Sequence, residues 1–144
     1  SRDSANYLCG MEPKIAVLSY STASTNSDDE VIIKEKEAIR LFKEKDSKTL
    51  IEGEMQADCA LLPDTAKRKF PNGKLNGRAN VLIFPDINAG NIGYKLVQHF
   101  TGGRAVGPII QGLNKPVNDL SRSATAEEIY LTAIITLLQT QQNQ

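Results

Sequence analysis

The sequence predicts an α/β fold, an α/β/α sandwich in which a mostly parallel sheet carries helices on its faces. Short apolar runs of strand length recur along the chain, and segments of helical pattern separate them. The expected strands are residues 14–20, 49–53, 80–84 and 105–111. The expected helices are residues 2–8, 28–45, 57–62, 64–69, 92–100 and 125–140. Ligands of such folds bind beside the loops that follow the carboxyl ends of the strands.

In the first half of the chain, Gly10 is expected to end the opening helix, because glycine adopts the left-handed conformation of many helix stops. Residues 14–20 are a short apolar run, typical of a buried strand. Ser27 or Asp28 is expected to cap the next helix, whose acidic start and basic end suit the helix dipole. The inward stripe of this helix is expected to be Val31, Ala38, Leu41 and Phe42.

In the second half, Pro63 separates two short helical pieces, and residues 80–84 are the clearest strand of the chain. Residues 105–111 are a fourth apolar segment, which predicts a strand. Residues 125–140 are long and mostly apolar, so this helix is expected to be packed on several sides.

Composition excludes several functions. Lys plus Arg and Asp plus Glu number 17 each, so net charge favours neither nucleic acid nor an acidic lipid surface. No apolar run approaches the ~20 residues of a membrane span, and no signal or transit peptide is expected. Cys9 and Cys59 are interpreted as packing residues of a protein in a reducing cytoplasm, and one histidine excludes a histidine-rich metal site. The start at Ser1 rather than Met suggests a fragment or a processed chain.

The loop of residues 85–91 joins a strand to a helix and has two interpretations. Gly90 lets a ligand approach the backbone, the free amides of the helix start can bind an anion, and Lys95 adds a positive charge one turn later. Alternatively, this is a well-formed turn in which Asn88 caps the helix and Lys95 lies in solvent.

The segment before the last helix combines a hydroxyl, a cation and a carboxylate. Ser121 offers the hydroxyl, and the planar guanidinium of Arg122 matches phosphate oxygens. Thr125 and Glu128 have the spacing of a capping box. Glu128 can instead be a carboxylate that accepts a proton from a thiol, and one glutamate can serve both roles in different states.

Other polar residues are less informative. The hydroxyls of residues 19–22 either line a cleft or satisfy turn backbone. Arg68 and Lys69 bind phosphates or are simply solvated. The sequence contains no GxxxxGK[ST], GxGxxG, HExxH or GxSxG, which argues against nucleotide hydrolysis, simple dinucleotide binding, zinc proteolysis and serine hydrolysis.

Two long segments, residues 79–98 and 107–122, closely resemble the signature stretches of the phosphate acetyltransferase (phosphotransacetylase) family. Residues 14–22 and 51–63 also resemble this family, most clearly at Glu52-Gly-Glu-Met-Gln-Ala-Asp58. The resemblance therefore covers essentially the whole chain.

This resemblance implies a reversible reaction in which acetyl-CoA and phosphate give acetyl phosphate and CoA, the CoA thiolate attacking in one direct displacement. By position it implies that Ser121 and Arg122 hold the carbonyl and phosphate oxygens and that Glu128 assists thiol deprotonation. The sequence departs from the family here, because typical members have Asp as the base and Gly-Cys after Ser-Arg, where this chain has Ser123-Ala124. Glutamate is one methylene longer, which alters the geometry of deprotonation but not its chemistry. The substrate-binding residues implied for the same cleft are Lys95, Asn91, Asp86 and Asn118.

The resemblance also implies a fold like that of isocitrate and isopropylmalate dehydrogenases, with two α/β domains and the active site between them. Residues 1–107 would be the later part of the second domain, and residues 108–144 a returning segment that completes the first. Coenzyme A would be a substrate, no catalytic metal is expected, and family members are usually cytoplasmic homodimers. The chain alone is expected to be an incomplete catalyst.

Three alternatives stay open at this stage. The acyl group could be larger, as in a phosphate butyryltransferase, and nothing in these residues fixes pocket size. The chain could be a non-catalytic module that binds acetyl-CoA, like the related domains fused to malic enzymes. A plain interaction domain is the third alternative, against which the two long motif matches argue.

Overall fold

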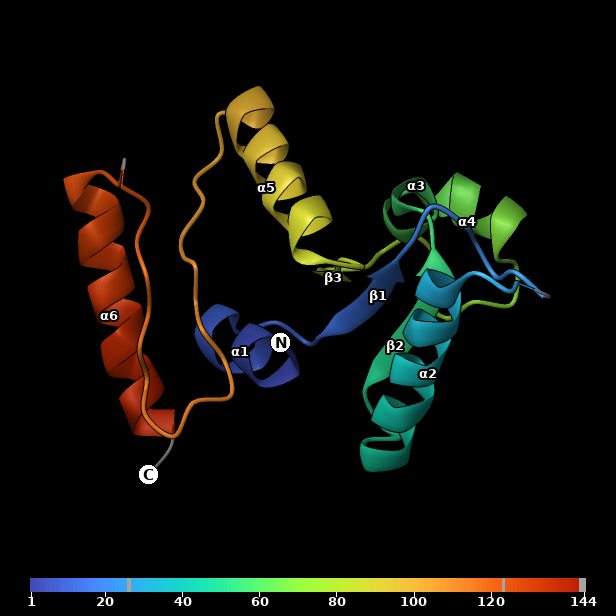
Figure 1. The fold of residues 1–144 in the computed structure, drawn as a ribbon, viewed down its shortest axis with the longest axis horizontal. Helices are drawn as coiled ribbons and strands as arrows, with labels where there is room; N and C mark the ends of the chain where they lie inside the picture. Colours follow the sequence, from blue (N-terminus) through green and yellow to red (C-terminus); the bar gives the residue numbers. More distant parts are fainter. Residues whose placement is uncertain (26, 123, 143–144) are drawn as a thin grey trace.

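The computed structural model describes residues 1–25, 27–122 and 124–142, which form nine helices and strands. In chain order these are α1 (Arg2–Cys9), β1 (Lys14–Leu18), α2 (Glu30–Lys45), β2 (Leu50–Met55), α3 (Ala57–Leu61), α4 (Pro63–Lys69), β3 (Val81–Ile83), α5 (Ile87–Thr101) and α6 (Ala126–Gln142). Figure 1 shows a small α/β body around the strands, with α5 and α6 standing away from it. No helix in the described part of the chain is long and apolar enough to cross a membrane.

The sheet has three strands, all parallel, in the order β2-β1-β3. The predicted α/β class with a parallel sheet is therefore confirmed. The pairing of β1 with β2 shifts register between Ala16 and Leu18, opposite Gly53. A Cβ atom on Gly53 would lie 2.6 Å from the carbonyl oxygen of Val17, and Gly53 has a φ of 146°. Only glycine fits this position without displacing the backbone of the central strand.

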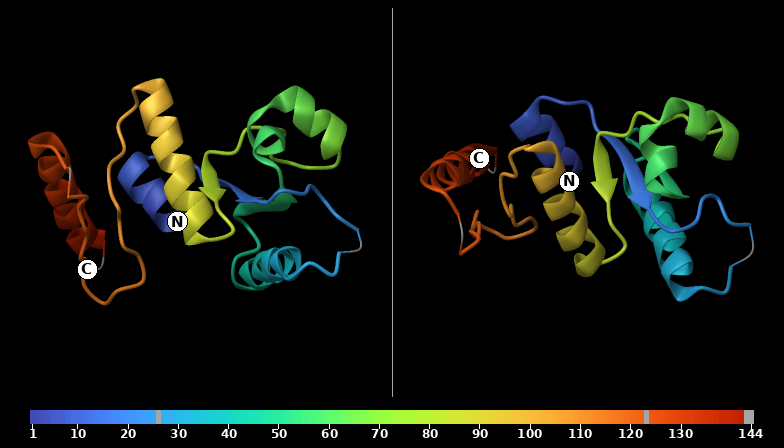
Figure 2. Two further views of the ribbon diagram at one scale, coloured as in Figure 1. Left: turned by 45° about the horizontal axis from the view of Figure 1, so that its top comes forward. Right: turned by 90° about the horizontal axis from the view of Figure 1, so that it is seen from above.

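Helices cover both faces of the sheet, because alternate residues of the buried strands point to opposite sides. On one face, Ala16 and Leu18 pack with Cys59, Ala60 and Ala66 of α3 and α4. On the other face, residues of the three strands pack against α2, and this cluster consists of Ile15, Val17, Ile39 and Ile51 with Phe42, Val81 and Ile83 beside it. Figure 2 shows α2 and the α3–α4 pair on opposite sides of the sheet.

Of the predicted inward stripe of α2, Phe42 packs on the core as expected, but Val31, Ala38 and Leu41 are exposed. The helix buries Ile32, Glu35 and Ile39, whereas Val31 and Leu41 are 37% and 44% exposed. Glu35 interrupts the row of apolar residues on the buried face, so the helical repeat is hard to recognise in the sequence. The three consecutive apolar residues at 31–33 also leave open which of them points inward. The predicted cap is also wrong, because Asp29 accepts a hydrogen bond from the Val31 amide at 2.8 Å.

The predicted strand at residues 105–111 does not form. Pro108 has no amide hydrogen to give to a neighbouring strand, and the Ile110 amide donates to the Asn118 side chain instead, at 2.9 Å. The segment runs extended between α5 and α6 (Figure 1). The helix expected at residues 92–100 begins earlier, at Ile87, because Asp86 rather than Asn88 caps it.

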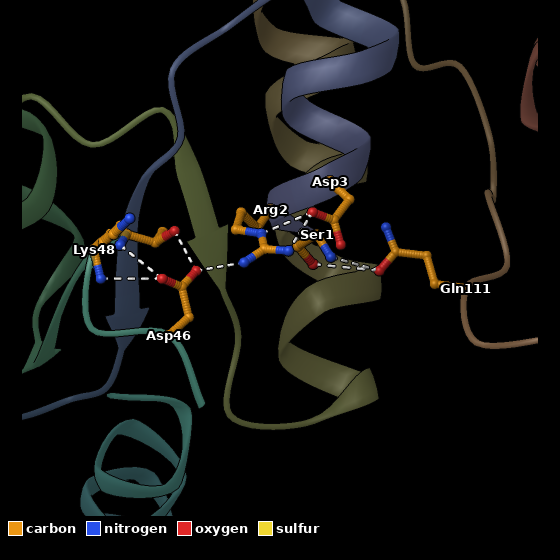
Figure 3. A network of polar contacts seen from close by, with 7 residues as sticks. Ser1, Arg2, Asp3, Asp46, Lys48 and Gln111 are labelled. Atoms are coloured by element: carbon orange, nitrogen blue, oxygen red, sulfur yellow. Dashed lines mark hydrogen bonds and ion pairs between the residues drawn. The ribbon is translucent and has the colours of Figure 1, made fainter. Parts of the chain in front are cut away.

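Helix α1 is joined to the rest of the chain by polar contacts (Figure 3). Arg2 donates to Asp46 at 2.5 Å, and so links α1 to the turn between α2 and β2. Bonds from Thr49 and Arg2 hold the pKa of the Asp46 carboxyl well below its usual range. On the opposite side, the Gln111 amide donates to the Ser4 hydroxyl at 2.8 Å, which ties α1 to the segment between α5 and α6.

Helices α5 and α6 leave much apolar surface uncovered. None of the side chains of α5 is buried, and Ile87 and Phe100 are 81% and 85% exposed. On α6, Tyr130 and Leu137 are each 65% exposed. The total accessible surface, 10069 Å², exceeds by more than a third the area of about 7,300 Å² expected of a compact chain of this mass. The long apolar helix at the end of the chain is therefore not packed on several sides within these residues, contrary to expectation.

The carboxyl of Glu35 is buried inside the body, 3% exposed, and its two oxygens lack a well-formed hydrogen bond from any described residue. Burial raises the pKa of this carboxyl above its ordinary value, the nearby Ser19 hydroxyl opposes the rise, and the negative charge of Glu54 adds to it. Glu54 is itself fully buried, although its Oε1 accepts a hydrogen bond from the Ser24 amide at 2.6 Å.

Replacing Glu35 with Gln is expected to stabilise the protein more at pH 8 than at pH 5. Because the folded-state pKa is raised, the folded form keeps a proton that the unfolded form releases above about pH 4.5, so wild-type stability falls as pH rises through that window. In the glutamine variant this pH-dependent loss of stability does not occur. We expect the difference in the free energy of unfolding to be about 1–3 kcal/mol, the cost of a buried polar group without a hydrogen bond. Urea unfolding at the two pH values measures the effect.

Glu37→Gln is the matched control on the same helix. Its hydrogen bond from Arg40 lowers the pKa of the Glu37 carboxyl, so its stabilisation is present above the unfolded pKa and is lost as pH falls. Between pH 5 and pH 8 this variant should therefore keep a nearly constant stability relative to the wild type. A Glu35→Gln variant with the same pH trend as Glu37→Gln would show that Glu35 is ionised without cost.

Candidate functional site

The start of α5 is fixed by contacts on three sides. The Asp86 carboxylate accepts a hydrogen bond from the Ala89 amide at 2.9 Å, as a helix cap. Lys34 of α2 donates to the Pro85 carbonyl at 3.0 Å. A Cβ atom on Gly93 would lie 2.9 Å from the Phe84 ring, so glycine lets this ring pack against the helix. The end of β3 therefore sets the direction of α5.

The loop before α6 is tied to that helix by Asn118. Its side-chain amide donates to Thr136 at 2.9 Å and to Gln139 at 2.6 Å. Its oxygen accepts the Ile110 amide, as described above. One side chain thus binds both the extended segment and the helix, and this network holds the loop that carries Ser121 against α6.

The start of α6 is a capping box. The Thr125 amide donates to Glu128 Oε2 at 2.7 Å, and the Glu128 amide donates back to the Thr125 hydroxyl at 3.2 Å. The Thr125 hydroxyl also lies 3.1 Å from Oε2. The capping interpretation of the sequence is confirmed, and the carboxylate of Glu128 is held beside the helix N-terminus.

A hollow of about 350 Å³ lies between α5 and the start of α6. From α5 it receives Tyr94, Lys95, Gln98 and His99, and from the loop before α6 and its first turn it receives Leu120, Ser121, Ala124, Thr125 and Glu128. Ala105 and Gly107 of the extended segment form its floor. Figures 1 and 2 show α5 and α6 on either side of that segment. The hollow unites a hydroxyl, a carboxylate and two basic side chains from segments far apart in the sequence.

A second hollow, of about 490 Å³, is lined by the start of α5 and the same extended segment and is mostly apolar. It shares Tyr94, Ala105 and Gly107 with the first, so the two are neighbours. Asn91 lines this second hollow, with Ile87 and Pro108. The pair offers a polar compartment beside an apolar one.

Only some of the predicted site residues lie together in the structure. Ser121, Glu128 and Lys95 line one hollow together. Arg122 is exposed and does not line it, although its neighbour Ser121 does. Asp86 is engaged in capping α5 and Asn118 in holding the loop, so their predicted contacts with substrate stay predictions.

Sequence reasoning missed His99 and Gln98 as residues of the hollow. The signal was present: Gln98 and His99 follow Tyr94 and Lys95 by four residues each, so all four lie on one side of a helix. Once Lys95 was singled out, the helical period alone would have added His99.

The polar loop after β1 proves to be structural. The Thr22 hydroxyl accepts the Gln56 amide at 3.0 Å, and Lys36 donates to the Ser24 hydroxyl at 3.1 Å. Thr22 fits the alternative in which these hydroxyls satisfy backbone, whereas the Tyr20 hydroxyl donates to the Asp29 carboxylate at 2.8 Å instead. Lys69 likewise pairs with Asp58 at 2.8 Å.

The fold and the hollow define an α/β domain with a mixed polar site between two helices. The family model described as "Phosphate acetyl/butaryl transferase" matches residues 1–137, and the chain belongs to this family.

Among curated proteins, a phosphate acetyltransferase of Staphylococcus aureus (strain Mu50 / ATCC 700699) is 49% identical over 135 residues, which cover 90% of this chain and 40% of that protein. A phosphate acetyltransferase of Staphylococcus epidermidis (strain ATCC 12228) is 48% identical over 136 residues, 90% of this chain and 41% of that protein. The chain thus spans about two fifths of the length of these relatives.

Solved structures give the same assignment. A phosphotransacetylase from Streptococcus pyogenes has a TM-score of 0.90 at 42% identity, over 98% of this chain and 43% of that one. EutD phosphotransacetylase from Staphylococcus aureus has a TM-score of 0.85 at 45% identity, over 96% and 43%. A branched-chain phosphotransacylase from Enterococcus faecalis V583 is more distant, with a TM-score of 0.74 at 26% identity, over 96% and 51%.

Removing the capping hydroxyl with Thr125→Ala is expected to destabilise the protein by about 1 kcal/mol, because the Glu128 amide loses its acceptor. Urea unfolding measures this loss, and hydrogen exchange of the first turn of α6 localises it. Thr140→Ala, an exposed threonine near the other end of the same helix, is the control and should change stability little. Equal losses in the two variants would contradict a special role for the capping box.

Proposed function

We propose that this chain carries part of the active site of a phosphate acetyltransferase, which moves an acetyl group reversibly between CoA and inorganic phosphate. The observation that carries the proposal is the joint placement of Ser121, Lys95 and Glu128 around one hollow. Family membership and relatives named phosphate acetyltransferase at 48–49% identity support the choice of reaction.

The proposed chemistry begins with the thiol of CoA. Glu128 accepts the thiol proton, and the thiolate attacks the carbonyl carbon of acetyl phosphate. The C–S bond forms as the bond between carbonyl carbon and phosphate oxygen breaks, and phosphate leaves with the bonding electrons. A thiol with a pKa of about 8.5 needs only modest help at neutral pH, so a carboxylate next to a helix N-terminus suffices as the base.

The other residues of the hollow hold charge and position. The Ser121 hydroxyl is proposed to donate to the carbonyl oxygen, on which negative charge develops. Lys95 and His99 lie on the same side of α5 and would contact phosphate groups of CoA or acetyl phosphate. Arg122, exposed next to Ser121, is proposed to turn onto the departing phosphate when substrate is present, since its planar fork matches two phosphate oxygens.

We propose that residues 1–107 and 108–144 belong to different domains of the complete enzyme. Two observations support this division. Helix α6 exposes Ile129, Tyr130 and Leu137, and its principal contact with another helix is with the short α1. The relatives are more than twice as long as the matched segment. A further domain packed on α6 would cover this apolar surface and enclose the hollow, so the active site would lie between two domains.

Acetyl is favoured over larger acyl groups because the phosphate acetyltransferases are nearer in sequence than the branched-chain phosphotransacylase, at 49% against 26% identity. We further propose that the protein is a homodimer in the cytoplasm, in which part of the apolar surface of α5 packs against a second copy of the chain. Two free cysteines, of which Cys59 is buried in the core, are compatible with a reducing compartment. The non-catalytic acetyl-CoA-binding module is the second candidate, and turnover distinguishes it.

Arg122→Ala is expected to lower kcat about 10²–10³-fold, because one charged donor to the transition state is lost. The measurement is acetyl-CoA formation from acetyl phosphate and CoA by the protein in its natural full length. Arg68→Ala, an exposed arginine on α4, should leave the rate unchanged. Equal activity of Arg122→Ala and the unmodified protein would mean that Arg122 does not contact the departing phosphate and that the proposed site is wrong.

The 144 residues alone are expected to give no turnover above the uncatalysed rate, because one wall of the proposed site is absent. The same assay, run on this chain and on the full-length protein, tests the proposed division into domains. Robust turnover by the 144 residues would contradict it. Activity in neither form would instead favour the acetyl-CoA-binding module.

A further inference from the structure

A third hollow, of about 580 Å³, lies near the amino ends of β1 and β3 and shares no residue with the two hollows beside α5. Four basic side chains line it: Lys14 at the start of β1, Lys67 on α4, and Lys74 and Arg78 on the loop before β3. Asp64 is the one acidic residue among its lining. Three separate elements therefore direct positive charge into one concavity.

The backbone that carries these four residues is tightly fixed. A Cβ atom on Gly77 would lie 2.4 Å from the carbonyl carbon of Leu62, so glycine lets the loop lie directly on the start of α4. Leu75, between Lys74 and Arg78 in the sequence, is buried. Asn80 binds Lys14 through both its backbone and its side chain, at 3.0 and 2.7 Å. The fold thus fixes the backbone positions from which the four basic side chains line the hollow.

Within the described part of the chain, none of the four basic side chains forms an ion pair, although seven ion pairs are found there. The whole chain carries equal numbers of basic and acidic residues, so the excess of cations around this hollow is local. Like charges that a rigid backbone holds together repel one another unless an anion lies between them.

We propose that this hollow binds an oligophosphate, an anion with two or three linked phosphate groups. Two or three phosphates would offset the net positive charge of this lining, which has four basic side chains and one acidic one. Lysines supply mobile point charges and Arg78 a planar fork, which is the combination that phosphate recognition uses. The volume lies within the range of about 300–1,000 Å³ typical of small-ligand sites. This site is separate from the proposed acyl-transfer site, so either can fail without the other.

The phosphate chain could belong to inorganic oligophosphate or to a nucleoside triphosphate, and calorimetry separates the two. Tripolyphosphate is titrated into the protein at low salt, and ATP is titrated in parallel. Equal affinities mean that the hollow recognises the phosphate chain alone. Tighter binding of ATP, by about tenfold or more, means that it also recognises the nucleoside. Either result supports an oligophosphate site.

Charge-reversal variants locate the bound anion. Arg78→Glu and Lys67→Glu are each expected to weaken tripolyphosphate binding by about tenfold or more. Lys45→Glu, an exposed lysine at the end of α2 with the same charge change, should leave the affinity within about twofold. Lys95→Ala should also leave it unchanged, because Lys95 lines the hollow beside α6 and does not line this one.

Three results would overturn the proposal. The first is no binding of tripolyphosphate at concentrations up to about 1 mM. The second is an equal loss of affinity in Lys45→Glu, which would show a general effect of net charge. The third is loss of binding in Lys95→Ala with none in Arg78→Glu, which would place the phosphates in the acyl-transfer site.

Discussion

The reciprocal hydrogen bonds between Thr125 and Glu128 are the interaction on which the candidate site depends. They begin α6 at a defined residue, and they hold one oxygen of the Glu128 carboxylate in place through two bonds to Thr125. Because the cap uses Oε2, the other oxygen is the one available to a substrate. The residue that caps the start of α6 is therefore the same residue that we propose as the base, and its carboxylate is held by Thr125.

The arrangement of α5 and α6 follows from a small number of polar contacts rather than from a core. Asp86, Lys34 and Phe84 direct α5, whereas Asn118 and the Arg104–Glu127 ion pair at 2.6 Å hold the loop and α6. Such contacts define geometry but contribute little stability when exposed, since surface ion pairs are worth about 0–1 kcal/mol. The exposed apolar surface of both helices would contribute stability if the proposed further domain covers it.

Sequence patterns predicted the sheet well, because a buried parallel strand leaves a short apolar run bounded by turn residues. They failed where one local pattern is compatible with two different structures. The apolar run at residues 105–111 reads as a strand, but Pro108 and the bond from Ile110 to Asn118 make it an extended connection. On α2, the buried Glu35 disguised the inward face. For the site, the loop and cap motifs indicated Ser121 and Glu128, and the helical period from Lys95 places His99 on the same side of α5. The approach of α5 to the start of α6 depends on the angle between two helices, which no local pattern encodes.

The central claim is that Glu128 acts as a base and not only as a cap, and Glu128→Gln tests it most directly. Glutamine at this position can still complete a capping box, but it cannot take a proton from a thiol. In the full-length protein, the account predicts that kcat falls about 10²–10⁴-fold while the free energy of unfolding changes by less than about 0.5 kcal/mol. Unchanged kcat in a stably folded Glu128→Gln variant would contradict the account, because it would leave Glu128 with a structural role alone.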